Sequence, residues 1–538
     1  MAASRRLLAI ADDLSGAAEV AAALHSRTTR SRVLLIGRPG AVNGGVARAL
    51  RPRHPGEATV LDLDSRYRPA TEAAEAVREA LRLSSPDENA PDALDTLVLK
   101  KIDSLLRGNV AAEIAALAED GAGVVLAPAL PIAGRVVRSG VVHLGGVALH
   151  ESDAWRAETL PPPASVAHAL GGLPTALVPL TTVRASRRTL LTALRTAAAA
   201  GRVAICDAET DADLDAVVEA ALAEGPRMRL VGSGGLALAL GRHLRTTLNA
   251  IGAGAAPAAA GKRGAPAADA APAAPPAEMA VAAPPAEMAV GAARAAASPA
   301  SAGRPVLVVV GTAEPAAAEQ VRRLVEDGAV HHQLPLAELL SGGAPVRLPP
   351  LTAPVTVVSL GTPSGAPDPA PPHGAVATDT APLPSPRPAP EAIAPAAAPG
   401  PAPKPAPSTP PTSVSPPVDT ADRTGPDRPD GQTGKQPGAV SGRRLVLGLA
   451  RVIGDAVAAH HGAVDLVLTG GETARRVLDA LAVAELDPVG QVHHGAVHLA
   501  TPDGRSVVTR PGSFGDPDSL RQIVQALRPH STQRKVTP

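Results

Sequence analysis

The stretch LLAIADDLSGAAEVAAAL, residues 7–24, sets the fold class of this chain. Its first five residues, Leu7–Ala11, form an apolar run of strand length, and Ala17–Leu24 has the pattern of a helix. The polar turn Asp12–Gly16 therefore stands where a strand passes into a helix. A short buried strand that leads directly into a helix is the building unit of α/β proteins.

The same alternation recurs along the rest of the chain. Further strands are expected at residues 96–102, 124–126, 203–206, 229–231, 306–310, 356–360 and 465–468. Helices are expected at residues 110–119, 214–223, 236–244, 315–327, 443–460 and 472–482, and a hairpin at 140–149. Short apolar strands that alternate with helices predict mainly parallel sheets with helices on both faces.

Two stretches rich in Pro and Ala, residues 249–303 and 362–441, interrupt this pattern. The first contains the tandem repeat APPAEMAVA and APPAEMAVG, residues 274–291. Such a composition buries too little apolar surface to offset chain entropy, so we predict that both stretches are disordered. The predicted organisation is two α/β domains, residues 4–248 and 304–527, with the second stretch inserted in the second domain.

The composition excludes several classes of protein. Lys plus Arg and Asp plus Glu number 51 each, so charge gives no reason to expect nucleic acid or an anionic membrane as a partner. The single cysteine, Cys206, excludes an intrachain disulfide and a cysteine-based zinc site. The N-terminal apolar run is too short for a signal peptide, and no stretch of about 18 uninterrupted apolar residues occurs. We therefore expect a cytoplasmic protein.

Charged residues follow the first predicted strands, at the edge where parallel sheets bind ligands. Asp12 and Asp13 follow the first strand, and Lys100 and Lys101 end the strand at 96–102. Because successive strand residues point to opposite faces, only one of the two lysines is expected in a site. An aspartate that merely caps the following helix remains an alternative interpretation of the first pair.

The loop after Lys101 adds Asp103, Ser104 and Arg107, and Arg135 follows the next strand in a proline-containing loop. Lysine and arginine together suit a carboxylate or a phosphate. A cluster of surface salt bridges is the alternative interpretation.

The second predicted domain carries glycine-containing loops. Its first strand ends in Gly311-Thr312, and the strand at 465–468 ends in TGGET, residues 469–473, where a helix begins at once. Glycines there let backbone N–H groups approach an anion, and a helix N-terminus favours negative charge. A plain turn is the alternative. No G-x-x-x-x-G-K-[ST] motif occurs, and the GSGGLA stretch, residues 232–237, lacks the later acidic residue of a dinucleotide site.

Taken together and in order, these loops resemble the four-carbon acid sugar kinase family. KKIDSLLRGN, residues 100–109, is similar to the family's KKIDSTLRGN, and DDLSG, residues 12–16, to its DDxTG turn. LTGGETA, residues 468–474, is similar to its TGGDTA. The stretches at 60–66, 127–149, 232–237 and 507–515 also fit the family pattern.

The resemblance implies a sugar-acid-binding N-terminal domain and an ATP-binding C-terminal domain, with phosphoryl transfer in the cleft between them. It implies ATP and Mg²⁺ as cofactors, a small sugar acid as substrate, and no nucleic-acid or membrane partner. Asp13 or Asp103 is expected to orient or deprotonate the attacking hydroxyl, with Lys101 and Arg107 on the substrate carboxylate. The further expected substrate-binding residues are Asp12, Ser15, Arg66, Ser104 and Arg135. The expected nucleotide-binding residues are Gly311, Thr312, Thr469, Gly470, Gly471, Glu472, Thr473, Gly512 and Gly515.

The chain departs from the family pattern in the second domain. The family's GSxSxxT becomes GTAEPAA, residues 311–317, which loses hydroxyls and adds Glu314. Arg510 replaces a lysine, and Ser513 a glycine. A sugar-acid-binding protein with a degenerate nucleotide site is therefore the alternative function. The sequence does not select one sugar acid or an oligomeric state.

Overall fold

A computed structural model describes eleven parts of the chain, which are residues 6–26, 29–36, 56–84, 96–155, 158, 160–254, 303–312, 315–340, 346–361, 437–512 and 515–528. The predictions of disorder at 249–303 and 362–441 fall almost wholly outside these residues, as do Ala313, Glu314 and Ser513. Residues up to 361 and from 438 onward belong to one compact unit. We call residues 6–254 the N-terminal half, and residues 303–361 with 437–528 the C-terminal half.

The N-terminal half is a parallel sheet, as predicted. In spatial order its strands are β2 (Ser31–Leu35), β3 (Ala58–Asp62), β1 (Arg6–Ala11), β4 (Thr96–Lys101), β11 (Met228–Gly232), β5 (Gly123–Ala127), β10 (Val203–Cys206) and β9 (Thr175–Val178). Strands β2, β3 and β9 were not predicted; each has only four or five residues.

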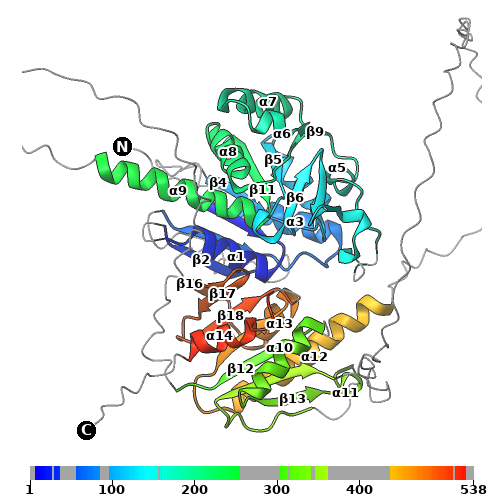
Figure 1. The fold of residues 1–538 in the computed structure, drawn as a ribbon, viewed down its shortest axis with the longest axis vertical. Helices are drawn as coiled ribbons and strands as arrows, with labels where there is room; N and C mark the ends of the chain where they lie inside the picture. The colour runs from blue at the N-terminus through cyan, green and yellow to red at the C-terminus, as the bar shows by residue number, and fades with distance from the viewer. Residues whose placement is uncertain are drawn as a thin grey trace, which may run out of the picture. The chain divides into compact units, whose positions relative to one another are not determined.

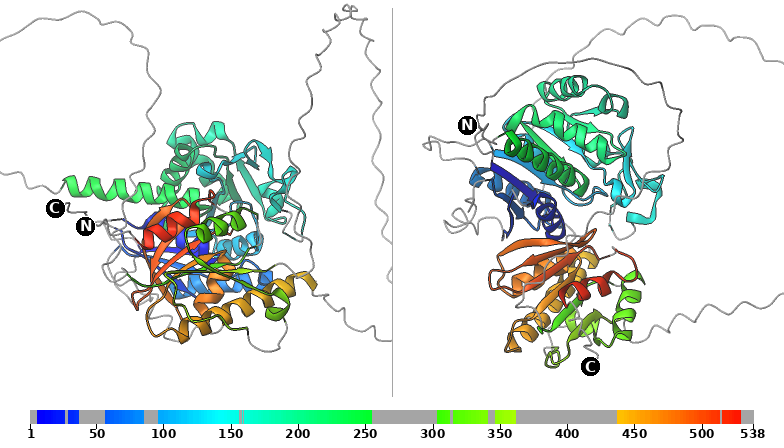
Figure 2. Two further views of the ribbon diagram at one scale, coloured as in Figure 1. Left: turned by 60° about the horizontal axis from the view of Figure 1, so that its bottom comes forward. Right: turned by 60° about the vertical axis from the view of Figure 1, so that its left-hand side comes forward.

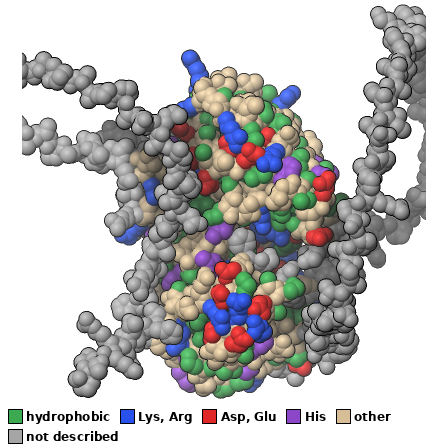
Figure 3. Space-filling model, viewed as in Figure 1, with side chains coloured by type: hydrophobic (Ala, Val, Ile, Leu, Met, Phe, Trp, Pro, Cys, Tyr) green, Lys and Arg blue, Asp and Glu red, His purple; other side chains and the backbone are tan. Residues whose placement is uncertain are grey.

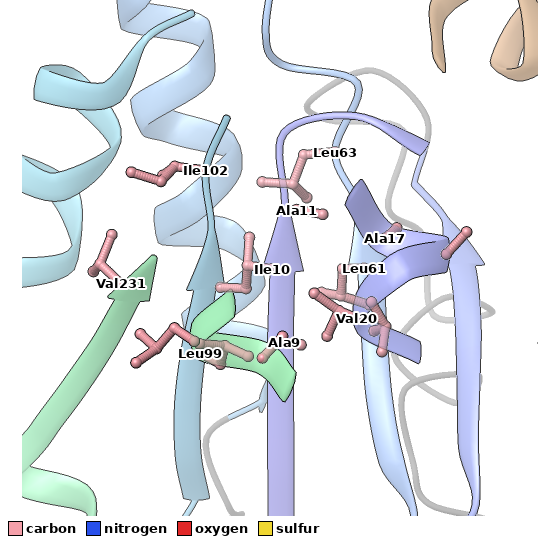
Figure 4. Close-up of a cluster of buried hydrophobic side chains, with 14 of the residues drawn as sticks. Ala9, Ile10, Ala11, Ala17, Val20, Leu61, Leu63, Leu99, Ile102 and Val231 are labelled. Carbon is pink, nitrogen blue, oxygen red and sulfur yellow. The ribbon is translucent and has the colours of Figure 1, made fainter. Parts of the chain in front are cut away.

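Helices cover both faces of this sheet (Figure 1). They are α1 (Leu14–Leu24), α3 (Ala70–Ser84), α4 (Val110–Ala118), α5 (Val166–Ala169), α6 (Leu180–Val183), α7 (Arg187–Ala199), α8 (Asp211–Leu222) and α9 (Gly234–Gly254). Between the layers lies an aliphatic core in which Ile10, Leu99 and Val231 come from three neighbouring strands (Figure 4). Burial of such side chains stabilises the fold by about 1.5–3 kcal/mol each.

A second, small sheet contains the predicted hairpin at 140–149 and adds one strand before it. It has three antiparallel strands, β6 (Arg135–Arg138), β7 (Val141–Leu144) and β8 (Val147–Ala148). The first strand begins five residues before the predicted hairpin, directly after Gly134, whose φ is +65°. The left-handed backbone of this glycine turns the chain into β6, and the sequence pattern alone did not show it.

The C-terminal half carries the remaining strands. Five of them run parallel, β13 (Val330–Leu334), β14 (Val355–Leu360), β12 (Val306–Val310), β15 (Asp465–Thr469) and β18 (Ser506–Arg510). The last two, β17 (Ala496–Ala500) and β16 (Glu485–His493), are antiparallel. The helices are α10 (Pro315–Glu326), α11 (Leu336–Leu340), α12 (Pro437–Ala459), α13 (Gly471–Ala480) and α14 (Ser519–Leu527).

In the C-terminal half, helices lie on both faces of the sheet (Figure 2), and strand β12 is buried on both sides. Val306, Val308 and Val310 pack into a cluster with α10 and α14, whereas Leu307 and Val309 belong to the larger core with α12 and α13. Because alternate strand residues point to opposite faces, a continuous run of Val and Leu marks a strand covered on both sides.

The two halves share one sheet, which corrects the expectation of a separate sheet for each domain. Strand β16 pairs antiparallel with β2, placing Glu485 opposite Leu34 and Leu486 opposite Val33. The amide of Leu35 also donates to the carbonyl of Ala484 at 2.9 Å. The result is a continuous sheet of 15 strands, mixed but mostly parallel. Among the described helices, none is long and apolar enough to cross a membrane.

In each half, the strand order reverses at the first strand. The chain leaves β1 for β2 and β3 on one side and then reaches β4 on the other. In the same way it leaves β12 for β13 and β14 before it reaches β15 on the opposite side. Open α/β sheets bind ligands in the crevice at such points, beyond the carboxyl ends of the strands. Many of the predicted site residues follow these four strands, β1, β4, β12 and β15, whereas Arg66, Arg135 and Gly512 follow β3, β5 and β18.

Candidate active site

A cavity of about 530 Å³ is lined by loops from both halves. Every predicted substrate residue lines it, as do six of the predicted nucleotide residues, Gly311, Gly470, Gly471, Glu472, Thr473 and Gly512. Thr312, Thr469 and Gly515 do not line it. The structure thus brings together loops that lie up to about 500 residues apart in the sequence, as the interdomain location predicts.

Arg66 organises the carboxylates that follow β1. Its guanidinium makes a two-pronged contact with Asp12, with Nε 2.8 Å from Oδ2 and Nη2 3.0 Å from Oδ1. The remaining nitrogen, Nη1, lies 2.8 Å from Oδ2 of Asp13. Bidentate arginine–carboxylate pairs fix orientation as well as charge. Arg66 therefore holds two adjacent carboxylates that would otherwise repel each other.

The pKa values of the two aspartates shift in opposite directions. Burial acts to raise the pKa of Asp12, but Arg66 and Lys100 together lower it below its usual value. Burial raises the pKa of Asp13, with Asp12 adding to that effect and Arg66 opposing it. Asp13 is also the N-cap of α1, since its Oδ1 accepts a hydrogen bond from the amide of Gly16 at 2.8 Å. The capping interpretation is therefore correct for Asp13, which lines the cavity as well.

Four hydrogen bonds hold the carboxylate of Asp103. Arg107 grips it with Nε at 2.7 Å and Nη2 at 2.8 Å, and the amides of Leu105 and Arg107 donate to the same carboxylate. Although burial opposes it, hydrogen bonds from Arg107 and the charge of Arg66 hold the pKa of Asp103 far below its ordinary range. Asp103 is therefore a fixed anion and a weak base.

The two lysines point apart, which confirms that only one enters the cavity. Nζ of Lys101 lies 3.3 Å from Oε2 of Glu19, and both residues line the cavity. Nζ of Lys100 lies 3.0 Å from Oε2 of Glu113, an ion pair in which both side chains are buried. The Lys100–Glu113 pair sits on the other face of β4, outside the cavity lining.

Two polar side chains in the cavity have spare binding capacity. Arg135 hydrogen-bonds Ser104 Oγ, and no carboxylate among the described residues lies within 4.0 Å of its guanidinium. Burial lowers the pKa of Arg135, although Asp103 opposes the shift. Oγ of Ser15 is buried and has no hydrogen-bond partner in the described part of the chain. Buried polar groups usually have partners, so both are placed to meet a ligand.

The glycine loop after β15 reaches Asp13. Gly470 has φ +87° and is the N-cap of α13, where it supplies no side-chain hydrogen bond to the first turn. A Cβ on Gly471 would overlap Oδ2 of Asp13 and lie 3.1 Å from Oγ of Ser15. A Cβ on Gly311 would likewise overlap Thr473. Glycine is needed at 471 and 311 because neighbouring groups come too close for any side chain.

Three predicted nucleotide residues lie behind the cavity wall. Oγ1 of Thr469 donates to the carbonyl of Val309 at 3.2 Å, which ties β15 to β12. Thr312 lies beside Gly512, where a Cβ would stand 3.4 Å from its side chain. Gly515 has φ +94° and packs against Arg510 and Ser519. These residues shape the loops instead of facing the cavity.

Other cavity residues carry charge that the sequence reasoning missed, namely Glu19, Asp64, Asp153, Arg443 and Arg476. Glu19, Arg443 and Arg476 lie within helices, where a charged residue looks like an ordinary solvated position. Asp64 has φ +50°, a backbone conformation that residues other than glycine rarely adopt. Burial and Asp64 raise the pKa of Glu472, whereas Arg476 lowers it.

Arg475 and Arg476 connect α13 to the end of β3. Nη1 of Arg475 lies 2.8 Å from Oδ2 of buried Asp62, and Nη2 of Arg476 lies 2.6 Å from Oδ2 of Asp64. Burial raises the pKa of Asp62 to about 6, with Arg475 opposing the shift. The helix that begins with the glycine loop is thus anchored beside the loops that follow β1 and β3.

Two family models match this chain. Residues 7–240 match the sugar-binding N-terminal domain, and residues 416–520 match the nucleotide-binding C-terminal domain. The chain belongs to the four-carbon acid sugar kinase family. In this family member, the sugar-binding match contains the Asp12–Arg66–Asp103 cluster, and the nucleotide-binding match contains the glycine loop at 469–473.

Curated relatives of this family member are kinases of four-carbon acids. The D-threonate kinase of Cupriavidus necator is 38% identical over 236 residues, which are 43% of this chain and 53% of the relative. The D-threonate kinase of Salmonella typhimurium is 32% identical over 44% of this chain and 53% of the relative. The D-erythronate kinase of Heliobacterium modesticaldum is 31% identical over 34% of this chain and 42% of the relative. The chain spans about half the length of the curated relatives that it matches.

Solved structures share the fold. A protein from Salmonella typhimurium LT2 superposes with a TM-score of 0.56 at 15% identity, covering 96% of this chain and 98% of that one. Haemophilus influenzae protein HI1011 gives a TM-score of 0.54 at 17% identity, covering 96% and 99%. At these identities the likeness concerns the fold alone.

Proposed function

We propose that this protein is a kinase that transfers the γ-phosphoryl group of ATP to a hydroxyl of a four-carbon sugar acid of the threonate, erythronate or oxo-tetronate type. Residues 4–248 would form the sugar-acid domain and residues 304–527 the nucleotide domain. The family match and the D-threonate and D-erythronate kinase relatives support this reaction.

One observation carries the proposal. Gly471, in the glycine loop of the C-terminal half, abuts the Asp13 carboxylate of the N-terminal half within a single cavity. A phosphate held by the first turn of α13 would therefore lie next to a carboxylate that can accept a proton. Phosphoryl transfer depends mainly on such positioning and on neutralisation of charge.

The geometry favours Asp13 over Asp103 as the group that accepts the proton of the attacking hydroxyl. Burial raises the pKa of Asp13, which makes it the stronger base of the two. Asp103 is held as an anion by Arg107 and by two backbone amides. We assign to Asp103 the role of fixing Arg107 at the mouth of the substrate site.

Arg135 is the best anchor for the substrate carboxylate. Lys101 and Arg107, which the sequence reasoning placed on that carboxylate, already have the carboxylate partners Glu19 and Asp103. In the described part of the chain, the guanidinium of Arg135 bonds the hydroxyl of Ser104 and no carboxylate, so a substrate carboxylate would complete its pairing. Lys101 and Arg107 would add charge from the side.

The nucleotide phosphates would meet the N-terminus of α13, with Ser15 and Thr473 as nearby hydroxyls. Mg²⁺ usually binds one or two carboxylates together with substrate phosphates, and Glu472 and Asp64 supply such a pair in the cavity. No cluster of three or more metal-ligating side chains occurs among the described residues, which fits an ion held largely by phosphates. When bound, the ion would neutralise phosphate charge during transfer.

The experiment is an ADP-release assay with a panel of four-carbon acids, with and without Mg²⁺. Turnover of at least one acid that requires both ATP and Mg²⁺ is the expected result. If no acid is turned over, calorimetry with Mg·ATP decides between the functions. Sugar-acid binding without any Mg·ATP binding up to millimolar concentration would establish the binding protein with a degenerate nucleotide site.

A further inference from the structure

Glu19 is a charged group in the cavity to which the proposed reaction gives no role. It lies on α1, six residues after Asp13, and its side chain is 17% exposed. Its Oε2 contacts Nζ of Lys101 at 3.3 Å, and that is its one ion-pair partner within the described ranges. An ionised carboxylate offers about four acceptor sites, so a single ammonium leaves most of its capacity unused.

The backbone opposite is shaped around this carboxylate. A Cβ on Gly234, at the start of α9, would overlap Glu19, and the three nearest atoms to that point all belong to the Glu19 carboxyl group. Gly234 itself lines the cavity. The glycine thus leaves room for the carboxyl group of Glu19 to lie against the wall instead of extending into solvent.

Glu19 also lies close to the proposed reaction centre. A Cβ on Gly16 would stand 2.8 Å from Oδ1 of Asp13 and 3.1 Å from Nζ of Lys101. The base and the ammonium that holds Glu19 therefore flank the same point of α1. A four-carbon acid that presents one hydroxyl to Asp13 would bring a neighbouring hydroxyl within reach of the Glu19–Lys101 pair.

The C-terminal half closes this part of the cavity. The turn between β16 and β17 contains His494 and Gly495, and Gly495 lines the cavity with φ +80°. Burial lowers the pKa of His494, Glu19 acts to raise it, and His493 and Arg135 act to lower it, so the charges of Glu19 and Arg135 both act on His494. Residues of both halves thus line the cavity that contains Glu19.

We propose that the Glu19 carboxylate, held by Lys101 and seated against Gly234, is the specificity-determining group that accepts hydrogen bonds from the hydroxyls of the substrate that are not phosphorylated. This inference rests on the proposed function. The negative charge of Glu19 also repels the carboxylate of the substrate and directs it toward Arg135. Glu19 would thereby select both the hydroxyl groups of the substrate and the orientation in which the substrate binds.

The test measures binding of 2,3,4-trihydroxybutanoate and its 2-deoxy and 3-deoxy analogues by calorimetry, in the presence of a non-hydrolysable ATP analogue. A hydroxyl bonded to a charged group contributes enough to favour the full substrate by about 10- to 100-fold over at least one analogue. Glu19→Gln and Glu19→Ala should remove most of that preference, with binding of the weaker analogue unchanged within about threefold.

Two further variants separate specificity from structure. Gly234→Ala keeps the charge of Glu19 but pushes its carboxyl group away, so it should erode the same preference. Glu119→Gln removes a carboxylate that pairs with Arg78 on the protein surface, and it should not change the affinity for any of the three acids. Thermal unfolding of each variant verifies that it is folded.

Equal weakening of all three acids by Glu19→Gln would show that Glu19 only holds Lys101, and would overturn the inference. Equal binding of the three acids by the unchanged protein would do the same. The proposed function has a different failure, because then the unchanged protein would turn over none of the acids with Mg·ATP, whether or not it binds them.

Discussion

The N-terminal and C-terminal sides of the cavity are lined by different kinds of groups. On the N-terminal side, charged side chains are already paired, as in Arg66 with Asp12 and Asp13, and Arg107 with Asp103. On the C-terminal side, five glycines line the cavity, Gly311, Gly470, Gly471, Gly495 and Gly512, beside the charged side chains of Arg443, Glu472 and Arg476.

The difference follows from what each side would bind. A small sugar acid offers several polar groups in fixed positions, which suits rigid side chains whose charges hold each other in place. Phosphates present many equivalent oxygens, which suits backbone N–H groups and a helix N-terminus. The surface over α10 and α14 differs from both sides of the cavity, because its basic and acidic side chains form ion pairs that are exposed to solvent (Figure 3). Exposed pairs of that kind contribute little.

The largest expected effect is on turnover. Asp13→Asn should lower kcat by about 10²- to 10⁴-fold, because the variant cannot accept the proton of the hydroxyl. Asp103→Asn should lower the unfolding temperature, because it leaves Arg107 without its carboxylate, and should lower kcat less than Asp13→Asn does. Steady-state kinetics and thermal unfolding of both variants measure this contrast. The base assignment would be wrong if Asp13→Asn kept full activity.

The next effect is on the free energy of unfolding, through the buried Lys100–Glu113 ion pair outside the cavity. Glu113→Gln leaves Lys100 buried without a carboxylate, which should cost about 3–5 kcal/mol in the free energy of unfolding. The double variant Lys100→Met/Glu113→Leu should recover most of that loss, because it removes both charges. Urea unfolding measures both, and Arg322→Ala on exposed α10 is the control that should leave the curve unchanged. A Glu113→Gln variant as stable as the unchanged protein would contradict the requirement for pairing.

A smaller effect separates two neighbouring glycines. Gly471→Ala should lower kcat by about 10²-fold and raise the KM for ATP, because its Cβ would displace Asp13. Gly470→Ala strains a backbone at φ +87° and should cost about 1 kcal/mol of stability, with a weaker effect on kcat. Kinetics with varied ATP and varied acid measure the split. Equal losses for the two variants would place the phosphates elsewhere along the loop.

The smallest effect concerns the anchor between the halves. The pKa of Asp62 is raised to about 6 by burial, above its ordinary value of 3.8. A carboxyl group whose pKa is raised on folding stabilises the protein most below the unfolded value, and this stabilisation is lost as the pH rises through 6. The Asp62 contribution should be about 1 kcal/mol greater at pH 5 than at pH 7.

Urea unfolding of the unchanged protein and of Asp62→Asn at both pH values isolates this contribution, since the variant lacks the titrating group. The difference between the two proteins should therefore change with pH in the stated direction. A difference that is the same at pH 5 and pH 7 would mean that Asp62 keeps an ordinary pKa beside Arg475.

The sequence by itself determined the strand-and-helix alternation, most of the loops that line the cavity, and the family. Leu7–Ala11 and Val306–Val310 are apolar runs too short for anything but buried strands, and the residues directly after them include Asp12, Asp13 and Gly311. Local composition and spacing suffice for such elements because burial and turn chemistry act within a few residues.

The tertiary structure alone decided which groups pair and which residues from helices join the cavity. Glu19 and Arg476 look like solvated helix positions, yet packing places them beside Lys101 and Asp64. The join of β2 to β16, and the approach of Gly471 to Asp13, link residues about 450 positions apart. Such contacts depend on the geometry of the whole sheet, and no local pattern encodes them.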